Sequence, residues 1–121
     1  METQKQLVRM NDKQNELYRI VDIVVSCCST EVQDGKITMT REGVLGRSRN
    51  ENLCMARAIL VNQLIWAGYS VSTVSMLLGR SAPAIRSIKR KHDDYVDTSR
   101  AYRIALSEVV IKCRSVEPKG L

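Results

Sequence analysis

Residues 50–95 read NENLCMARAILVNQLIWAGYSVSTVSMLLGRSAPAIRSIKRKHDDY, and this stretch decides the fold. Residues 50–67 predict one helix that ends before Gly68, because glycine commonly follows the last turn of a helix. Its apolar residues fall on two stripes more than about 100° apart. One stripe holds Leu53, Ala56, Leu60, Leu64 and Ala67, and the other holds Met55, Ile59 and Trp66. A helix that is apolar on two faces is covered on two sides, so this helix is the predicted centre of a bundle, with Trp66 as a packing residue.

Two further helices are predicted after it, joined by the three residues Gly79, Arg80 and Ser81. Ser70 and Ser81 are the predicted N-caps, because a serine hydroxyl accepts a hydrogen bond from a free backbone N–H of the first turn. Pro83 falls in the first turn of the second helix, where a missing N–H costs little. Two helices joined by a three-residue turn are typical of a helix-turn-helix.

The two ends of the chain complete a predicted all-α bundle of about five helices. Residues 1–28 form an N-terminal unit, whose long amphipathic helix of residues 4–28 packs on the core or on a partner, and residues 100–114 form a last helix. Residues 29–121 form the helix-turn-helix domain. Within it, Asp34 and Gly35 separate two β-prone runs, which predicts a short β-hairpin within residues 30–42.

Composition excludes several classes of protein. The 121 residues are 44% hydrophobic and 26% charged, as in ordinary globular domains. No run approaches the roughly 20 apolar residues of a membrane span, and the polar start is unlike a signal peptide, so we expect a cytoplasmic protein. The four cysteines include no C-x-x-C pair, and no acid–base or nucleophile arrangement is visible. We therefore expect no metal, no cofactor and no enzymatic activity.

The net charge of +6 is concentrated in residues 47–96, which carry eight basic and three acidic side chains. Between Arg80 and Lys91 there are five cations and no acid. Such a run suits a polyanionic partner. It also fits a helix face that is merely solvated, and Arg80 could interact with a helix end instead of a phosphate.

The charges agree with the way a helix-turn-helix docks on DNA, with the N-terminal residues of its second helix at base edges in the major groove. The apolar face of that helix is predicted to hold Ile85, Ile88, His92 and Tyr95, with His92 as a structural residue. Arg86 and Arg90 lie on the opposite face, and Lys89 and Lys91 lie on the flanks, within reach of phosphates.

Residues 47–95 resemble the C-terminal duplex-DNA-binding domain of the bacterial replication initiator DnaA. The matching positions are Ala56-Arg57, Ser70-Val71, Gly79-Arg80, Ile85 and Arg90-Lys91, preceded by a basic loop. The resemblance implies an all-helical fold and a helix-turn-helix in the major groove. It also implies that Arg49 enters the minor groove and that Arg57 is a second contact nearby. From the residues alone, Arg57 sits beside the core stripe and could instead pair internally with an acid.

The sequence departs from that family where bases are read. Ser81-Ala82-Pro83-Ala84 replaces an Asp-His-Thr-Thr segment, which removes nearly every donor and acceptor that base reading needs. Arg86 is the one outward side chain suited to a bidentate guanine contact. The P-loop signature of the family's ATPase module is absent from the sequence.

The sequence thus predicts a non-enzymatic protein that binds double-stranded DNA. We expect it to act as an accessory factor in replication or transcription and to be encoded by a phage or mobile element. The predicted contacts are Arg47, Arg49, Arg57, Arg80, Ser81, Ala82, Pro83, Arg86, Lys89, Arg90 and Lys91. The alternative is a protein-interaction module that has lost base reading and forms a homodimer through its N-terminal helix.

Overall fold

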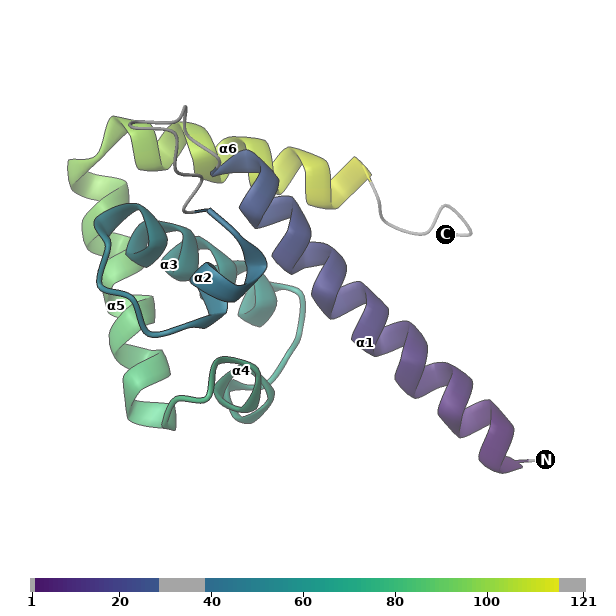
Figure 1. The fold of residues 1–121 in the computed structure, drawn as a ribbon. Helices are drawn as coiled ribbons and strands as arrows, with labels where there is room; N and C mark the ends of the chain where they lie inside the picture. Colours follow the sequence, from purple (N-terminus) through teal and green to yellow (C-terminus); the bar gives the residue numbers. More distant parts are fainter. Residues whose placement is uncertain (1, 29–38, 116–121) are drawn as a thin grey trace.

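A computed structural model describes residues 2–28 and 39–115 of the chain. Within these ranges the chain forms six helices, α1 (Glu2–Cys27), α2 (Arg41–Leu45), α3 (Glu51–Trp66), α4 (Val71–Leu78), α5 (Ala82–Thr98) and α6 (Arg100–Ser115). The predicted all-α bundle with a helix-turn-helix is therefore confirmed (Figure 1). It has one helix more than expected, because α2 carries no periodic pattern in its five residues.

Helix α3 lies at the centre and packs against α1 on one side and α5 on the other (Figure 1). Leu60 and Leu64 of its first stripe are fully buried, and so, within about one percent, is Ile59 of the second. The prediction that Trp66 packs in the core is wrong, since 70% of this residue is exposed. Trp66 is the last residue of α3, and the chain turns away directly after it through Gly68 at φ 101°.

The C-terminal half of α1 is part of the core. Leu17, Ile20, Val21 and Val24 recur at spacings of three and four and are all buried, and the helix packs against α3 and α6. Toward its N-terminus, α1 extends beyond the other helices (Figure 1).

Helix α2 stands close to the segment for which a β-hairpin was predicted. Residues 30–38 of that segment lie outside the described residues, and its last two residues, 41 and 42, are helical rather than extended. Thr40 caps α2 by accepting a hydrogen bond from the N–H of Gly43 at 2.9 Å. Arg41 then forms a bidentate ion pair with Asp22 of α1, with its closest N–O distance at 2.7 Å.

The turn between α4 and α5 is built as the sequence predicts. The hydroxyl of Ser70 accepts a hydrogen bond from the N–H of Thr73, and that of Ser81 accepts one from the N–H of Ala84. Gly79 ends α4 at φ 60°, a left-handed conformation that only glycine adopts without strain. The backbone thus leaves α4 and enters α5 within three residues.

Helix α5 is held on its inner side by α3, α4 and α6. Ile85 is fully buried, and the Nδ1 of His92 lies 2.5 Å from the hydroxyl of Tyr102 on α6. Burial lowers the pKa of His92 below its usual value, while the nearby Asp93 opposes this shift. The predicted structural position of His92 is therefore confirmed, and Tyr102 is its partner.

Candidate nucleic-acid interface

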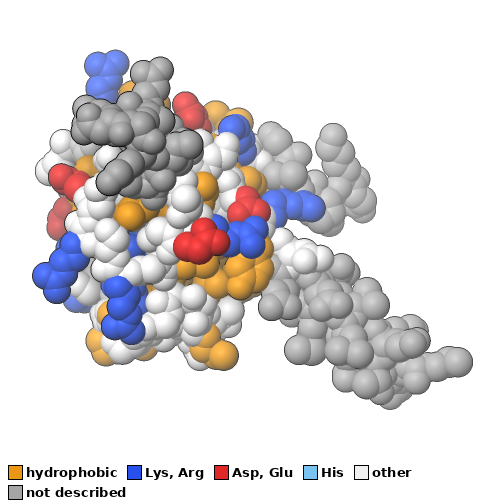
Figure 2. All heavy atoms as spheres, in the orientation of Figure 1, with side chains coloured by type: hydrophobic (Ala, Val, Ile, Leu, Met, Phe, Trp, Pro, Cys, Tyr) orange, Lys and Arg blue, Asp and Glu red, His pale blue; other side chains and the backbone are white. Residues whose placement is uncertain are grey.

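The outward face of α5, formed by Pro83, Arg86, Ser87 and Arg90, is exposed to solvent. The lower left of the view in Figure 2, over α5 and residues 46–50, carries Lys and Arg side chains, whereas the acidic side chains of this view lie higher, some at the left edge and others near the centre. Within the described part of the chain, Arg86 and Arg90 form no hydrogen bond or ion pair. Their guanidinium groups are therefore available to a ligand.

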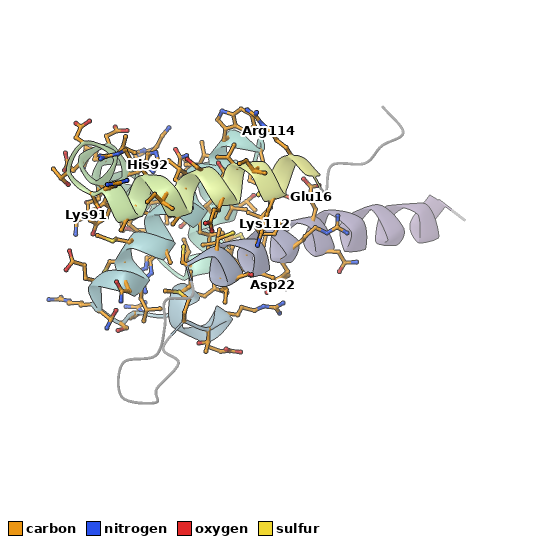
Figure 3. All side chains as sticks on the ribbon, turned by 90° about the horizontal axis from the view of Figure 1, so that it is seen from above. Glu16, Asp22, Lys91, His92, Lys112 and Arg114 are labelled. Atoms are coloured by element: carbon orange, nitrogen blue, oxygen red, sulfur yellow. The ribbon has the colours of Figure 1, made fainter. Side chains whose placement is uncertain are left out.

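Lys89 and Lys91 extend this basic surface along the flanks of α5. Both are exposed. Figure 3 shows the two sides of the helix at neighbouring residues: Lys91 projects at the edge of the bundle, whereas His92 lies beside the start of α6. Helix α5 is therefore apolar toward the core and cationic toward solvent, as its sequence predicts.

The tip of α5 offers little hydrogen-bonding chemistry. Pro83 is exposed and Ala82 and Ala84 are half-buried, and none of these side chains carries a donor or acceptor. The hydroxyl of Ser81 already accepts a hydrogen bond from the N–H of Ala84 at 3.3 Å. Arg86, one turn further on, is the first side chain of α5 that can donate to a base.

The loop before α3, residues 46–50, is here called the basic loop, and it is tied to the helix-turn-helix by two reciprocal hydrogen bonds. Arg47 of the loop donates to the carbonyl of Gly79 at 3.2 Å, and Arg80 of the turn donates to the carbonyl of Gly46 at 2.9 Å. Each segment thus receives an arginine from the other. This exchange fixes the distance between the basic loop and the start of α5.

Arg57 lies beneath the basic loop instead of on the surface. It is only 3% exposed, and its guanidinium donates to the carbonyls of Val44, Ser48 and Gly43 at 2.9, 3.2 and 3.3 Å. The sequence allowed either a DNA contact or an internal acid partner, and the structure instead gives Arg57 backbone carbonyl partners. Arg57 is therefore a positioning residue for α2 and the basic loop.

Between the basic loop and the start of α5 lies a hollow of about 720 Å³. Five cationic residues line it and no acidic residue does: Arg47, Arg49, Arg57, Arg80 and Lys91. We call it the basic hollow. Its volume is in the range of about 300–1,000 Å³ that is typical of ligand sites.

The surroundings of Arg80 in the basic hollow disfavour its positive charge. Burial lowers its pKa, and the positive charges of Arg57 and Arg47 lower it further. Its Nε is buried and has no hydrogen-bond partner. A buried donor without an acceptor costs free energy. An anion in the hollow would relieve the repulsion, and a rotation of Arg80 toward it would also pair the donor.

The structure thus brings most of the predicted residues to one side of the molecule. Those presented to solvent are Arg47, Arg49, Ser81, Pro83, Arg86, Lys89, Arg90 and Lys91, whereas Ala82 and Arg80 are half-buried and Arg57 is buried. Sequence reasoning did not assign Ser48 and Cys54, which also line the basic hollow. The position of Cys54 in the first turn of the helix after the basic loop was the available signal.

In comparisons with protein-family models, curated proteins and solved structures, the chain matched none of them. The described helices include none that is long and apolar enough to cross a membrane. Across the described residues, no three His, Cys, Asp or Glu side chains come together as metal ligands.

Proposed function

We propose that the protein binds double-stranded DNA, with α5 in the major groove and the basic loop at the neighbouring minor groove. The observation that carries this proposal is the outward face of α5, where Arg86 and Arg90 are exposed on a helix whose opposite side is locked into the core. A rigid cationic helix after a three-residue turn is the geometry that a helix-turn-helix uses to enter a major groove.

Phosphate contacts supply most of the affinity in this proposal. Lys89 and Lys91 on the flanks of α5 and Arg49 in the basic loop are exposed and form no hydrogen bond or ion pair with the described residues. Cations of this kind neutralise backbone phosphates and release counterions, which makes binding strong at low salt and weak at high salt.

Sequence preference rests on few groups. Arg86 can donate two hydrogen bonds to guanine, and the apolar Pro83 can contact a thymine methyl. The resemblance to the DnaA DNA-binding domain agrees with this docking. The tip of α5 lacks that family's base-reading side chains, so we do not expect this protein to prefer the DNA sites of that family. A non-enzymatic accessory role in replication or transcription, on a phage or mobile element, fits such a protein.

A titration of generic duplex DNA at low salt, followed by selection from random duplexes, tests the proposal. We expect Arg86→Ala to relax whatever sequence preference the selection finds, and Lys89→Ala to weaken binding to all sequences alike. Arg100→Ala is the matched control, because Arg100 is an exposed arginine at the start of α6, beyond the far end of α5 from its tip. Equal, uniform losses from Arg86→Ala and Lys89→Ala would show that Arg86 contacts only phosphate.

The competing proposal is a protein-interaction module that dimerises through α1. The extension of α1 beyond the other helices favours it (Figure 1). Light scattering of the free protein separates the two. A tight dimer with only micromolar or weaker, non-specific DNA binding would favour the interaction module, whereas tighter and sequence-dependent binding favours the first proposal.

A further inference from the structure

The basic hollow combines several positive charges with no internal counter-charge. Of its cationic residues, Arg57 is occupied by three carbonyls, and Arg47 and Arg80 each donate to one carbonyl of the facing segment. A carbonyl accepts a hydrogen bond from a guanidinium group but does not neutralise its positive charge. The positive charge of the hollow therefore remains, and none of the residues that line it is acidic.

One of the arginines that line the hollow also has an unpaired donor. The Nε of Arg80 is buried without an acceptor, although another nitrogen of the same guanidinium bonds to the Gly46 carbonyl at 2.9 Å. Guanidinium groups recognise phosphate oxygens through two neighbouring N–H groups. A small rotation of Arg80 would present such a pair to an anion in the hollow.

We propose that the basic hollow is a phosphate-binding site, in which Arg80 is the central ligand and Arg47, Arg49 and Lys91 surround the anion. This assignment stands on the residues of the hollow and not on DNA binding. The exposed Arg49 and Lys91 add charge at its mouth, where they can attract an anion from solvent.

The identity of the phosphate rests on the proposed function. If the tip of α5 occupies a major groove and the basic loop the adjacent minor groove, the sugar-phosphate strand that separates the two grooves must pass over the hollow between them. The hollow of about 720 Å³ is far larger than one phosphate ion and admits a length of strand. We therefore assign it to phosphodiesters of that strand. A free phosphate or a nucleotide has the same chemistry and is the alternative source of the bound phosphate group.

The first experiment uses the free protein and inorganic phosphate. Thermal unfolding is followed as sodium phosphate replaces sodium chloride at constant ionic strength. Phosphate also stabilises proteins in general, because it is excluded from their surfaces, so the informative quantity is the difference between variants. We expect a saturable rise in the melting temperature of the wild type at low millimolar phosphate. That rise should be absent in Arg80→Gln and reduced in Arg49→Gln and Lys91→Gln.

Arg100→Gln is the matched control and should keep the full rise. Arg49 and Lys91 donate to no described residue, so their variants keep the test valid if Arg80→Gln unfolds. A phosphate response that is identical in wild type, Arg49→Gln and Lys91→Gln overturns the assignment.

The second experiment distinguishes the two sources. At constant ionic strength, phosphate should displace generic duplex DNA from the wild type, and Arg80→Gln should bind duplex about tenfold more weakly, as expected for one lost charged hydrogen bond. Stabilisation by phosphate without any competition against duplex overturns the strand assignment and favours a free phosphate or nucleotide.

The two proposals fail in different ways. If the protein binds no duplex but shows the variant-dependent phosphate response, the proposed function is wrong and the phosphate site stands. If duplex binds and phosphate has no variant-dependent effect, the phosphate site is wrong and the proposed function stands.

Discussion

Two groups of arginines on one side of the molecule differ in whether their guanidinium groups are hydrogen-bonded within the protein. Arg47 and Arg80 donate to backbone carbonyls and hold the basic loop against the helix-turn-helix. Arg57 of α3 donates to carbonyls of α2 and of the basic loop. Arg86 and Arg90, on the outward face of α5, are exposed and donate to no described residue. In the sequence, all five belong to the one basic region of residues 47–96.

The difference teaches that charge and availability are separate properties. A guanidinium that has exchanged solvent for backbone carbonyls contributes chiefly to stability, because its removal leaves those carbonyls unpaired. A guanidinium on a rigid helix and open to solvent contributes chiefly to binding. The inner group should therefore control folding and loop position, with Arg80 serving in addition the proposed phosphate site, and the outer group should control affinity.

Replacement of Arg57 should have the largest effect on stability. Arg57→Met removes the guanidinium from three carbonyls at 2.9–3.3 Å while keeping an unbranched side chain. We expect the free energy of unfolding to fall by about 3 kcal/mol, given the strength of hydrogen bonds from charged donors. Urea denaturation measures it. Arg86→Met is the matched control and should leave stability unchanged within error. Similar stabilities for the two variants would show that Arg57 does not hold the loop.

Removal of the outer pair should reverse this pattern. Arg86→Ala with Arg90→Ala should lower duplex affinity tenfold or more, as expected for two lost contacts of roughly 1 kcal/mol each, and should leave the urea midpoint unchanged. Titration of a labelled duplex at low salt is the measurement. If the double variant binds as tightly as Arg100→Ala, the outward face of α5 does not contact DNA.

The turn that separates the two groups should depend on Gly79. Its φ of 60° strains any residue with a Cβ, although no neighbouring atom would meet that Cβ within 4 Å. We expect Gly79→Ala to lower the free energy of unfolding by about 1 kcal/mol, and Gly79→Asn to lower it less, since asparagine tolerates this conformation. Equal losses in both variants would argue against backbone strain as the cause.

The smallest effect concerns His92, on the inner side of the same helix as the outer arginines. Burial lowers its folded pKa below the usual 6.5, and the charge of Lys89 also lowers it while Asp93 opposes both. As pH falls below about 6.5, the unfolded state takes up a proton that the folded state does not, so stability decreases until the folded pKa is reached.

His92 is the one histidine in the sequence, which makes this dependence easy to isolate. Urea denaturation of wild type and His92→Gln between pH 7.5 and 5.5 should show the wild type losing stability relative to the variant as pH falls. Parallel curves for the two proteins would mean that the pKa of His92 is not lowered.

Much of the fold could be predicted from local patterns. The bounds of α3 to α6 agree with the apolar spacing, and the N-caps Ser70 and Ser81 and the glycine at position 79 stand where expected. Helix α2 was missed because five residues do not complete two turns. The exposure of Trp66 was missed because an apolar stripe shows in which direction a side chain points. It does not show how far along the helix the neighbouring helices cover it.

The candidate site could be predicted in part from the same kind of local pattern. The outward face of α5 follows from its periodicity, whereas the hydrogen bonds of Arg47 and Arg80 join residues 32 and 34 positions apart and leave no local signal. Arg57 is intermediate, because its place beside the core stripe allowed burial but did not identify its carbonyl partners.

The most direct test of duplex binding by the outer cations is the salt dependence of affinity. For about five neutralised phosphates, the logarithm of the association constant should fall with the logarithm of salt concentration at a slope of about −4 to −5. The slope should become shallower by about 2 in Arg86→Ala with Arg90→Ala if both contact phosphate, and by about 1 if Arg86 contacts a base. A wild-type slope near zero, or one that the double variant leaves unchanged, would contradict the account.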